Sequence, residues 1–126
     1  MENFSLPIQS AFAHAFVQDW AEAWNTHDLD RILAHYDDDV VLLSPVALRL
    51  LNNGTGIVQG KSALRDYFRI GLQAYPDLRF DVTDVLWGVE TIVAYYGTSV
   101  RASKTAEVMQ FNSAGKVIRV FANYNQ

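Results

Sequence analysis

The side chain in this sequence with the strongest chemical potential is Glu107, which lies inside the apolar stretch 105–111. A carboxyl group surrounded by apolar side chains loses hydration, so its pKa rises and it can act as an acid, a base or a hydrogen-bond donor near neutral pH. In a strand, Glu107 and Met109 lie on one face, and Ala106 and Val108 lie on the other. Both faces are mostly apolar, so strand alternation leaves open whether Glu107 points into the protein or out of the sheet.

Aromatic and hydroxyl-bearing side chains supply the other candidates for a binding site. Flat rings stack against an apolar ligand of a few rings, and hydroxyl groups can orient that ligand through hydrogen bonds. The same rings also fill ordinary cores, and each hydroxyl can bond the main chain instead, so both interpretations stay open. The predicted ligand-binding residues are Trp20, Trp24, Ser44, Tyr67, Phe68, Tyr95, Met109 and Tyr124.

Patterns for other kinds of active site are missing from the sequence. It contains no Cys, and its three His residues lack metal-ligand spacing. We expect His14 and His35 to be solvated helix residues and His27 to lie in a turn. Ser44 has no neighbouring base that would make it a nucleophile. The Asp triplet 37–39 lacks the spacing and glycine of a calcium-binding loop, and no phosphate-binding glycine loop is present. We therefore predict no metal and no cofactor.

Length and composition indicate one ordinary globular domain that spans residues 1–126. The net charge is -4 and the Lys and Arg residues are scattered, which argues against nucleic-acid binding. No apolar run approaches the roughly 20 residues that a membrane helix needs. The first ten residues lack the basic and apolar regions of a signal peptide. The sequence thus predicts a cytoplasmic protein without a nucleic-acid or membrane partner.

Three helices are expected in the first 75 residues of the chain. Phe12, Phe16, Trp20 and Trp24 recur at every fourth position, which predicts a helix over 10–25 with these rings facing the core. The other two helices are predicted at 29–36, after the N-cap Asp28, and from 61 or 62 to 75, before Pro76.

The C-terminal half predicts a meander of four antiparallel strands. Two of the predicted strands cover 78–87 and 91–100, and the other two lie within 104–124 on either side of a turn at 112–115. Residues 101–104 close a hairpin between the second and third of these strands, and short strands at 40–43 and 57–58 precede them. The strand 91–100 is apolar on both faces, so we expect both to be covered. The segment 46–51 fits no element clearly, and 46–58 is a candidate lid over a pocket. Segregated helices and strands indicate an α+β protein, with a curved sheet packed on the three helices.

This order of elements, together with several local phrases, resembles the nuclear transport factor 2-like superfamily, which includes SnoaL-like polyketide cyclases and ketosteroid isomerases. The phrases are Trp24-Asn25 before Asp28-Leu29-Asp30, Tyr36 with Asp38-Asp39, Gly60 before Tyr67-Phe68-Arg69-Ile70-Gly71-Leu72, and Glu107-Val108-Met109-Gln110-Phe111 with Gly115. The resemblance spans essentially the whole chain. It implies a cone-shaped, cystatin-like α+β roll with an internal pocket. The fold hosts unrelated activities and non-enzymatic binders, so function must be argued from the site.

Carried over residue by residue, the resemblance to ketosteroid isomerases argues against their reaction. Those enzymes use a Tyr on the first helix, an Asp before a Pro on the first strand, and an Asp on the penultimate strand. The corresponding positions are Trp20, Ser44 before Pro45, and Glu107, so only the third keeps an acid. A Ser hydroxyl cannot abstract an activated C–H proton near neutral pH without help. The resemblance therefore implies a related pocket with Glu107 facing inward, in a protein that is not a typical steroid isomerase.

Three functions are compatible with these features. The first is cofactor-free isomerase, cyclase or hydratase chemistry on a small, mostly apolar molecule, polycyclic ones included, with Glu107 as the acid or base, helped by Ser44 and a Tyr hydroxyl. The second is a binding protein with the same pocket and no chemistry, and the third is a dimeric interaction module with a filled cavity. If Glu107 faces inward, Val108 and Phe121 face outward. Apolar groups on the outer face of a sheet favour a symmetric homodimer, which the resemblance also implies.

Overall fold

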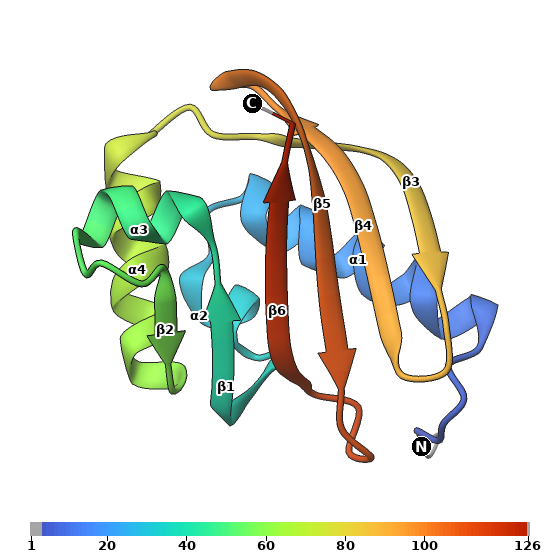
Figure 1. Cartoon of the computed structure of the whole chain (residues 1–126). Helices are drawn as coiled ribbons and strands as arrows, with labels where there is room; N and C mark the ends of the chain where they lie inside the picture. Colours follow the sequence, from blue (N-terminus) through green and yellow to red (C-terminus); the bar gives the residue numbers. More distant parts are fainter. Residues whose placement is uncertain (1–3, 126) are drawn as a thin grey trace.

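A curved, six-stranded sheet forms the frame of the protein; α1 lies behind the strands, and α3 and α4 lie beyond β1 and β2 (Figure 1). The computed structural model describes residues 4–125. The strand order is β2-β1-β6-β5-β4-β3, and neighbours are antiparallel except for β1 and β6, which run parallel. The elements are α1 (Ser10–Asn25), α2 (Leu29–Leu33), β1 (Tyr36–Leu43), α3 (Pro45–Leu51), β2 (Ile57–Gln59), α4 (Lys61–Ala74), β3 (Phe80–Trp87), β4 (Thr91–Thr98), β5 (Arg101–Phe111) and β6 (Val117–Tyr124). The predicted α+β class and the antiparallel meander of the last four strands are confirmed.

Helix α1 turns its aromatic stripe toward the sheet, as the four-residue spacing predicts. Phe16, Trp20 and Trp24 are buried, and the rings of Trp20 and Trp24 lie 5.3 and 5.0 Å from that of Phe80 on β3. Asn25 fastens the end of the helix to the same strand. Its Nδ2 donates to the carbonyl of Phe80 at 3.1 Å, and its Oδ1 accepts from the Phe80 N–H at 2.6 Å.

Strand β1 begins earlier than the sequence suggests, and the predicted helix over 29–36 is wrong at its end. Helix α2 stops at Leu33, and β1 starts at Tyr36 and includes the Asp triplet 37–39, which lies before the strand predicted at 40–43. Tyr36 is buried, and its Oη accepts a hydrogen bond of 3.1 Å from Trp20 Nε1. This tertiary contact places Tyr36 in the strand. The helix propensity of the local sequence is a weak preference that such a contact can override. The register between β1 and β6 shifts between Tyr36 and Val41, which is where the three Asp residues lie.

The segment that the sequence left without an element is a fourth helix, α3. Ser44 caps it, since its Oγ accepts from the Val46 N–H at 3.1 Å, and Pro45 occupies the first helical turn, where its missing N–H costs nothing. The helix ends at Asn52, which has a left-handed backbone with φ of 50°. No helix within residues 4–125 is long and apolar enough to cross a membrane.

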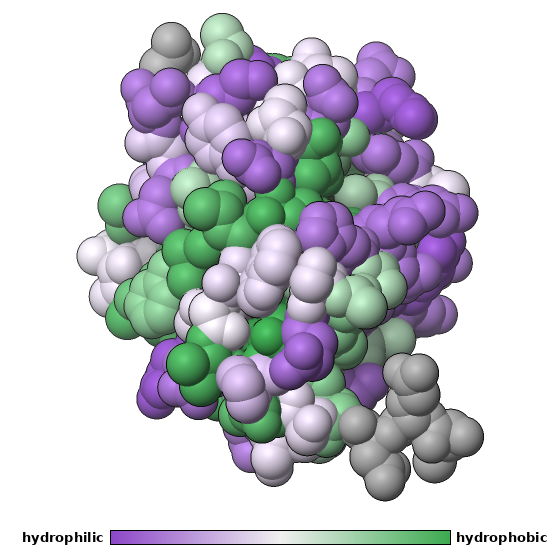
Figure 2. Space-filling model, turned by 90° about the vertical axis from the view of Figure 1, so that its right-hand side faces the viewer, coloured by the Kyte–Doolittle hydropathy of each residue, from purple (hydrophilic) through white to green (hydrophobic). Residues whose placement is uncertain are grey.

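An apolar row crosses the outer face of the sheet at one level. The register pairs Ile57 with Leu43, Leu43 with Phe121, Phe121 with Val108, Val108 with Val93, and Val93 with Leu86. All six strands therefore contribute one member to this outer row. Its members at both ends of the sheet are well exposed, with Leu86 at 52% and Ile57 at 39%. Figure 2 views the side of the molecule that carries β3 and shows hydrophobic residues gathered in a band there.

Candidate functional site

Glu107 lies in the middle of β5 with its side chain on the inner face of the sheet. Strands β4 and β6 pair with β5 on either side of it, so its backbone is held by two ladders. Only 7% of the residue is exposed, and Oε1 accepts a hydrogen bond of 2.6 Å from the hydroxyl of Tyr96 on β4. Strand alternation left open whether Glu107 points into the protein or out of the sheet. In the structure Glu107 faces inward together with Thr105, and Val108 faces outward.

Burial changes the proton affinity of both partners in this bond. It raises the pKa of Glu107 from 4.5 to about 7, and the hydrogen bond from Tyr96 opposes part of that rise. A carboxylate in an apolar wall loses its hydration, which favours the protonated form. A carboxyl group with a pKa near neutrality is present in both forms there, so it can accept or give a proton. Burial also raises the pKa of Tyr96 well above its ordinary value, so its hydroxyl remains a donor.

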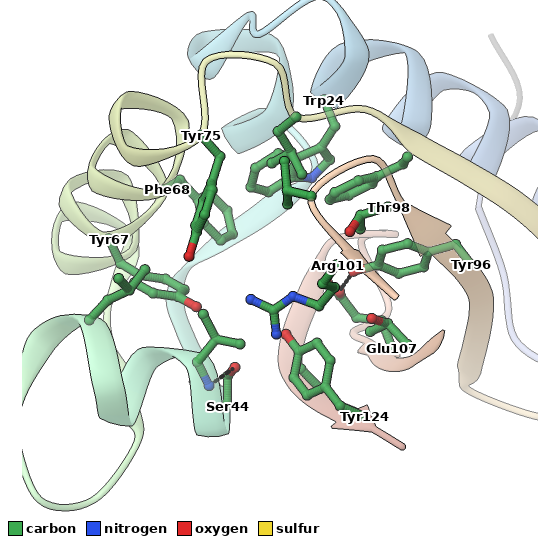
Figure 3. Close-up of a pocket in the computed structure, with 18 of the residues that line it drawn as sticks. Trp24, Ser44, Tyr67, Phe68, Tyr75, Tyr96, Thr98, Arg101, Glu107 and Tyr124 are labelled. Carbon is green, nitrogen blue, oxygen red and sulfur yellow. Dashed lines mark hydrogen bonds between the residues drawn. The ribbon is translucent and has the colours of Figure 1, made fainter. Parts of the chain in front are cut away.

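A cavity of about 100 Å³ lies beside Glu107 (Figure 3). Helices α1, α3 and α4 and the inner faces of the strands contribute side chains to its wall. The apolar part of the wall consists of Leu42, Val46, Leu50, Leu78, Phe80, Val100 and Ala122. Six of the nine predicted site residues also lie on it, namely Trp24, Ser44, Tyr67, Phe68, Glu107 and Tyr124. These six come from five elements or their caps and are brought together only by the fold.

The wall also contains polar residues that were not predicted as site residues, namely Tyr75, Tyr96, Thr98, Arg101 and Thr105. Two signals for them exist in the sequence. Arg101 and Thr105 lie an even number of residues from Glu107, so they share its face if the strand extends back to Arg101. The predicted strand begins only at 104, so Arg101 falls in the predicted hairpin connection and this relation is hidden. For Tyr96 there was no signal, because both faces of its strand are apolar.

Arg101 places a positive charge in the cavity. It is the first residue of β5, and Figure 3 shows its side chain pointing inward among Tyr67, Tyr75 and Tyr124. Its Cζ lies 5.2 Å from the ring centroid of Tyr124, within the range of a cation–π contact. Burial raises the pKa of Tyr124, and the neighbouring Ser44 hydroxyl and the charge of Arg101 oppose that rise.

Several buried polar atoms on this wall have no hydrogen-bond partner within residues 4–125. They are Nε1 of Trp24, Oγ1 of Thr98 and Oγ1 of Thr105. Leaving a buried donor without a partner costs on the order of 1–3 kcal/mol, so such groups are rare and call for an explanation. All three side chains line the same cavity, which is the arrangement expected of a site that completes its hydrogen bonds with a ligand.

Comparison with known proteins identifies the family. A family model described as "SnoaL-like domain" matches residues 17–123. This chain belongs to the SnoaL-like family. A SnoaL-like protein of unknown function from Burkholderia thailandensis is 34% identical, with a TM-score of 0.88 over 95% of this chain and 100% of that one. No curated protein matches the sequence significantly.

More distant structures share the fold alone. An NTF2-like protein of unknown function from Burkholderia pseudomallei is 17% identical, with a TM-score of 0.73 over 90% of this chain and 91% of that chain. A provisionally named ketosteroid isomerase from Kribbella flavida is 16% identical, with a TM-score of 0.69 over 92% of this chain and 79% of that chain. The predicted superfamily is confirmed. SnoaL-like and NTF2-like proteins bind small molecules and often act as isomerases or cyclases.

Two positions that the sequence resemblance assigns to ketosteroid isomerase catalytic residues have other tasks in this SnoaL-like chain. Trp20 is fully buried in the core, where its Nε1 donates to Tyr36, and it is not part of the cavity wall. The prediction that Trp20 lines the ligand-binding pocket is therefore wrong. Ser44 does line the cavity, but its Oγ accepts the capping bond from Val46. The third position, Glu107, is an acid on the wall.

Two further predicted ligand-binding residues lie away from the cavity. Tyr95 is on the outer face of β4 with 39% of its surface exposed, because its neighbour Tyr96 takes the inward position. Met109 faces inward on β5 but is fully buried in the core beyond the cavity wall. The prediction that these two side chains line the pocket is wrong.

The histidines do not form part of the cavity wall. His14 is an exposed helix residue, as predicted, and His27 is a turn residue whose Nε2 lies 2.7 Å from the carbonyl oxygen of Leu78. The prediction of a solvated helix residue is wrong for His35. It is partly buried after α2, and its Nε2 lies 2.7 Å from Oδ2 of Asp19, which keeps it bound to α1. Within residues 4–125, no cluster of three potential metal ligands occurs.

Proposed function

We propose that this SnoaL-like protein binds a small, mostly apolar molecule in the cavity beside Glu107 and exchanges a proton with it, as in isomerase or cyclase chemistry. The observation that carries the proposal is the buried hydrogen bond between Tyr96 and Glu107 on the cavity wall. The tyrosine fixes one oxygen of the carboxyl group in position. The apolar wall brings the pKa of Glu107 to about 7, where proton transfer in either direction is accessible.

The size of the cavity limits the ligand. A volume of about 100 Å³ is somewhat smaller than the cavity on the order of 150 Å³ that accepts benzene in other proteins. A ligand of about one ring therefore fits better than the several rings that the aromatic content of the sequence suggests. A polycyclic ligand requires side chains of the wall to move apart.

Cyclohex-3-enone is a suitable probe, because its conversion to the conjugated cyclohex-2-enone requires only proton transfer and is followed by ultraviolet absorbance. We expect the protein to bind this ketone and to accelerate the conversion. The Glu107→Gln variant should retain binding, because the amide has nearly the same shape, and should lose the acceleration. Glu90→Gln, which removes an exposed carboxylate, is the matched control. Failure of the ketone to shift any cavity resonance in NMR spectra would remove the proposal.

A non-catalytic binding protein is the second candidate, and one observation favours it. Apart from Glu107, the part of the wall formed by residues 4–125 contributes hydroxyl, indole and guanidinium groups but no second carboxylate or imidazole. Under this alternative, cyclohex-3-enone binds without conversion, and Glu107→Gln changes the affinity only. The probe experiment therefore separates the two candidates.

We also propose that two copies associate through the outer face of the sheet. The outer row of Ile57, Leu43, Phe121, Val108, Val93 and Leu86 supplies a continuous apolar strip at one level. Exposed apolar strips of this kind are typical of protein interfaces, and a two-fold axis brings the same strip together from both copies. The cytoplasmic location expected from the sequence stays a prediction.

A further inference from the structure

The guanidinium of Arg101 has no anionic partner in this structure. None of the ion pairs within residues 4–125 includes it. Among the described residues, the single carboxyl group on the cavity wall is that of Glu107, which is already bonded to Tyr96. A cation placed against a low-dielectric wall is costly unless an anion or a set of acceptors compensates it. The cavity therefore has an electrostatic preference for a negative ligand.

Two of the buried donors without partners lie on the same side of the cavity as Arg101. Thr98 is its register partner across the β4–β5 hairpin, and Phe80 is the partner of Thr98 on the other side. The ring of Trp24 stacks on Phe80 at 5.0 Å. Arg101, Thr98, Phe80 and Trp24 are therefore successive neighbours along one side of the cavity wall. Nε1 of Trp24, which has no partner within residues 4–125, can only donate a hydrogen bond. This side of the cavity requires acceptor atoms.

Glu107, which is hydrogen-bonded to Tyr96, follows Arg101 along β5. The cation–π contact brings the guanidinium to the ring of Tyr124, and Tyr124 is the register partner of Thr105. Thr105 precedes Glu107 by two residues, which is about 7 Å along a strand. Arg101, Thr105, Glu107 and Tyr124 all line the same cavity, so one ligand with a carboxylate at one end can contact both Arg101 and Glu107.

We propose that the ligand is a small monocarboxylate with an apolar, one-ring body, whose carboxylate is bound by Arg101 with Thr98 and Trp24 as further donors. The planar fork of a guanidinium matches the two oxygens of a carboxylate. Arg101 is the one cation on the described part of the wall, and its single charge matches a carboxylate better than a phosphate dianion. The inference rests on the proposed function, since it places the ring of the ligand between Arg101 and the proton-transfer group Glu107.

The test compares benzoate with benzamide, a neutral molecule of nearly the same shape. Each is titrated into the full chain and followed by proton–nitrogen NMR. We expect benzoate to bind at least tenfold more tightly than benzamide. Arg101→Gln should raise the dissociation constant for benzoate at least tenfold and abolish the preference over benzamide. Arg101→Lys, which keeps the charge but loses the fork, should give an intermediate value. Arg119→Gln removes a charge from the exposed face of β6 and should leave benzoate binding unchanged.

The outcomes separate this inference from the proposed function. Equal affinities for benzoate and benzamide, or no effect of Arg101→Gln, would overturn the carboxylate assignment while cyclohex-3-enone binding still supports the cavity. If neither aromatic probe nor cyclohex-3-enone perturbs the cavity resonances, both proposals fail. An equal loss of benzoate affinity in Arg119→Gln would show that net charge, rather than Arg101, governs binding.

Discussion

The hydroxyl of Tyr96 donates a 2.6 Å hydrogen bond to Oε1 of Glu107, although the two residues are not register partners. Tyr96 is paired with Thr105, and Glu107 is paired with Ala94, so the bond runs diagonally across β4 and β5. Diagonal neighbours in a sheet are within reach of a long aromatic side chain. The small side chain of Ala94 leaves room for this contact, and the carboxyl group is oriented by a residue that is itself buried.

Replacing Tyr96 with Phe should raise the pKa of Glu107 above its value of about 7. The hydrogen bond from Tyr96 stabilises the carboxylate form, and its removal leaves burial unopposed. Carbon-13 NMR of labelled Glu side chains across a pH series measures the change. Tyr95→Phe, on the outer face of the same strand, is the matched control. An unchanged or lowered pKa in Tyr96→Phe would contradict the assigned role of the bond.

The stability of the wild-type protein should fall as the pH rises from 4.5 to about 7 because of Glu107. The folded state has the higher pKa, so it binds more protons than the unfolded state in this window. The stability lost through Glu107 is about 3 kcal/mol as an upper bound, and this loss does not grow further above the folded pKa. Urea unfolding at several pH values should show Glu107→Gln gaining stability over wild type as the pH rises. A constant difference across the window would contradict the raised pKa.

Thr105→Val should stabilise the unliganded protein by about 1 kcal/mol, because it removes a buried hydroxyl that has no partner within residues 4–125. The same change should weaken benzoate or cyclohex-3-enone binding if the hydroxyl contacts a ligand. Thermal unfolding and NMR titration measure the two effects. For comparison, Thr83→Val removes a hydroxyl that donates to the Tyr95 carbonyl at 3.1 Å, so it should destabilise or leave stability unchanged. A destabilised Thr105→Val protein would mean that its hydroxyl is satisfied.

Gly56→Ala should destabilise the protein more than Gly54→Ala. Both glycines have a left-handed backbone, with φ of 72° and 76°, so both substitutions introduce backbone strain of about 1 kcal/mol. At Gly56 a Cβ would also lie 2.7 Å from the carbonyl oxygen of Ser44, whereas at Gly54 nothing lies within 4 Å. We expect an additional loss of about 1–3 kcal/mol at Gly56 in urea unfolding. Equal losses would mean that the chain around Ser44 moves freely.

Val108→Glu should convert a homodimer into monomers, because it places a charge at the centre of the outer row. The side chain faces away from the core, so the folded monomer should keep its circular-dichroism spectrum. Light scattering after size-exclusion chromatography gives the mass of each form. Gln73→Glu adds the same charge to an exposed position on α4 and should remain dimeric. A monomeric wild-type protein would remove the dimer proposal.

Much of the fold follows from regular patterns in the sequence. The four-residue aromatic spacing in α1 and the order of the last four strands were both predictable, because burial of one face imposes a period on each element. Tyr36 was misassigned to a helix because its partner, Trp20, is distant in sequence. Helix α3 was missed because its apolar residues are too few to show a period, although Ser44 and Pro45 form a recognisable N-terminal signal.

The site was predictable only in part. Glu107 was found because an acid among apolar residues is conspicuous, and the resemblance favoured its inward direction. The choice between Tyr95 and Tyr96 depends on a strand that is apolar on both faces, so alternation gave no preference. Arg101 was missed because charged residues near a Gly- or Ser-containing turn normally face solvent. Its even spacing from Glu107 becomes a signal only once β5 is known to extend back to Arg101.

The two ends of the inner face of β5 differ in how well they tolerate substitution. Arg101 has a single register partner and follows a short turn, whereas Glu107 is clamped between two strands at the centre of the sheet. Substitutions or insertions around the turn can therefore alter which molecules are admitted without disturbing the carboxyl–phenol pair. Under the proposed function, libraries randomised at 98–101 would therefore change the preferred ligand on an unchanged framework.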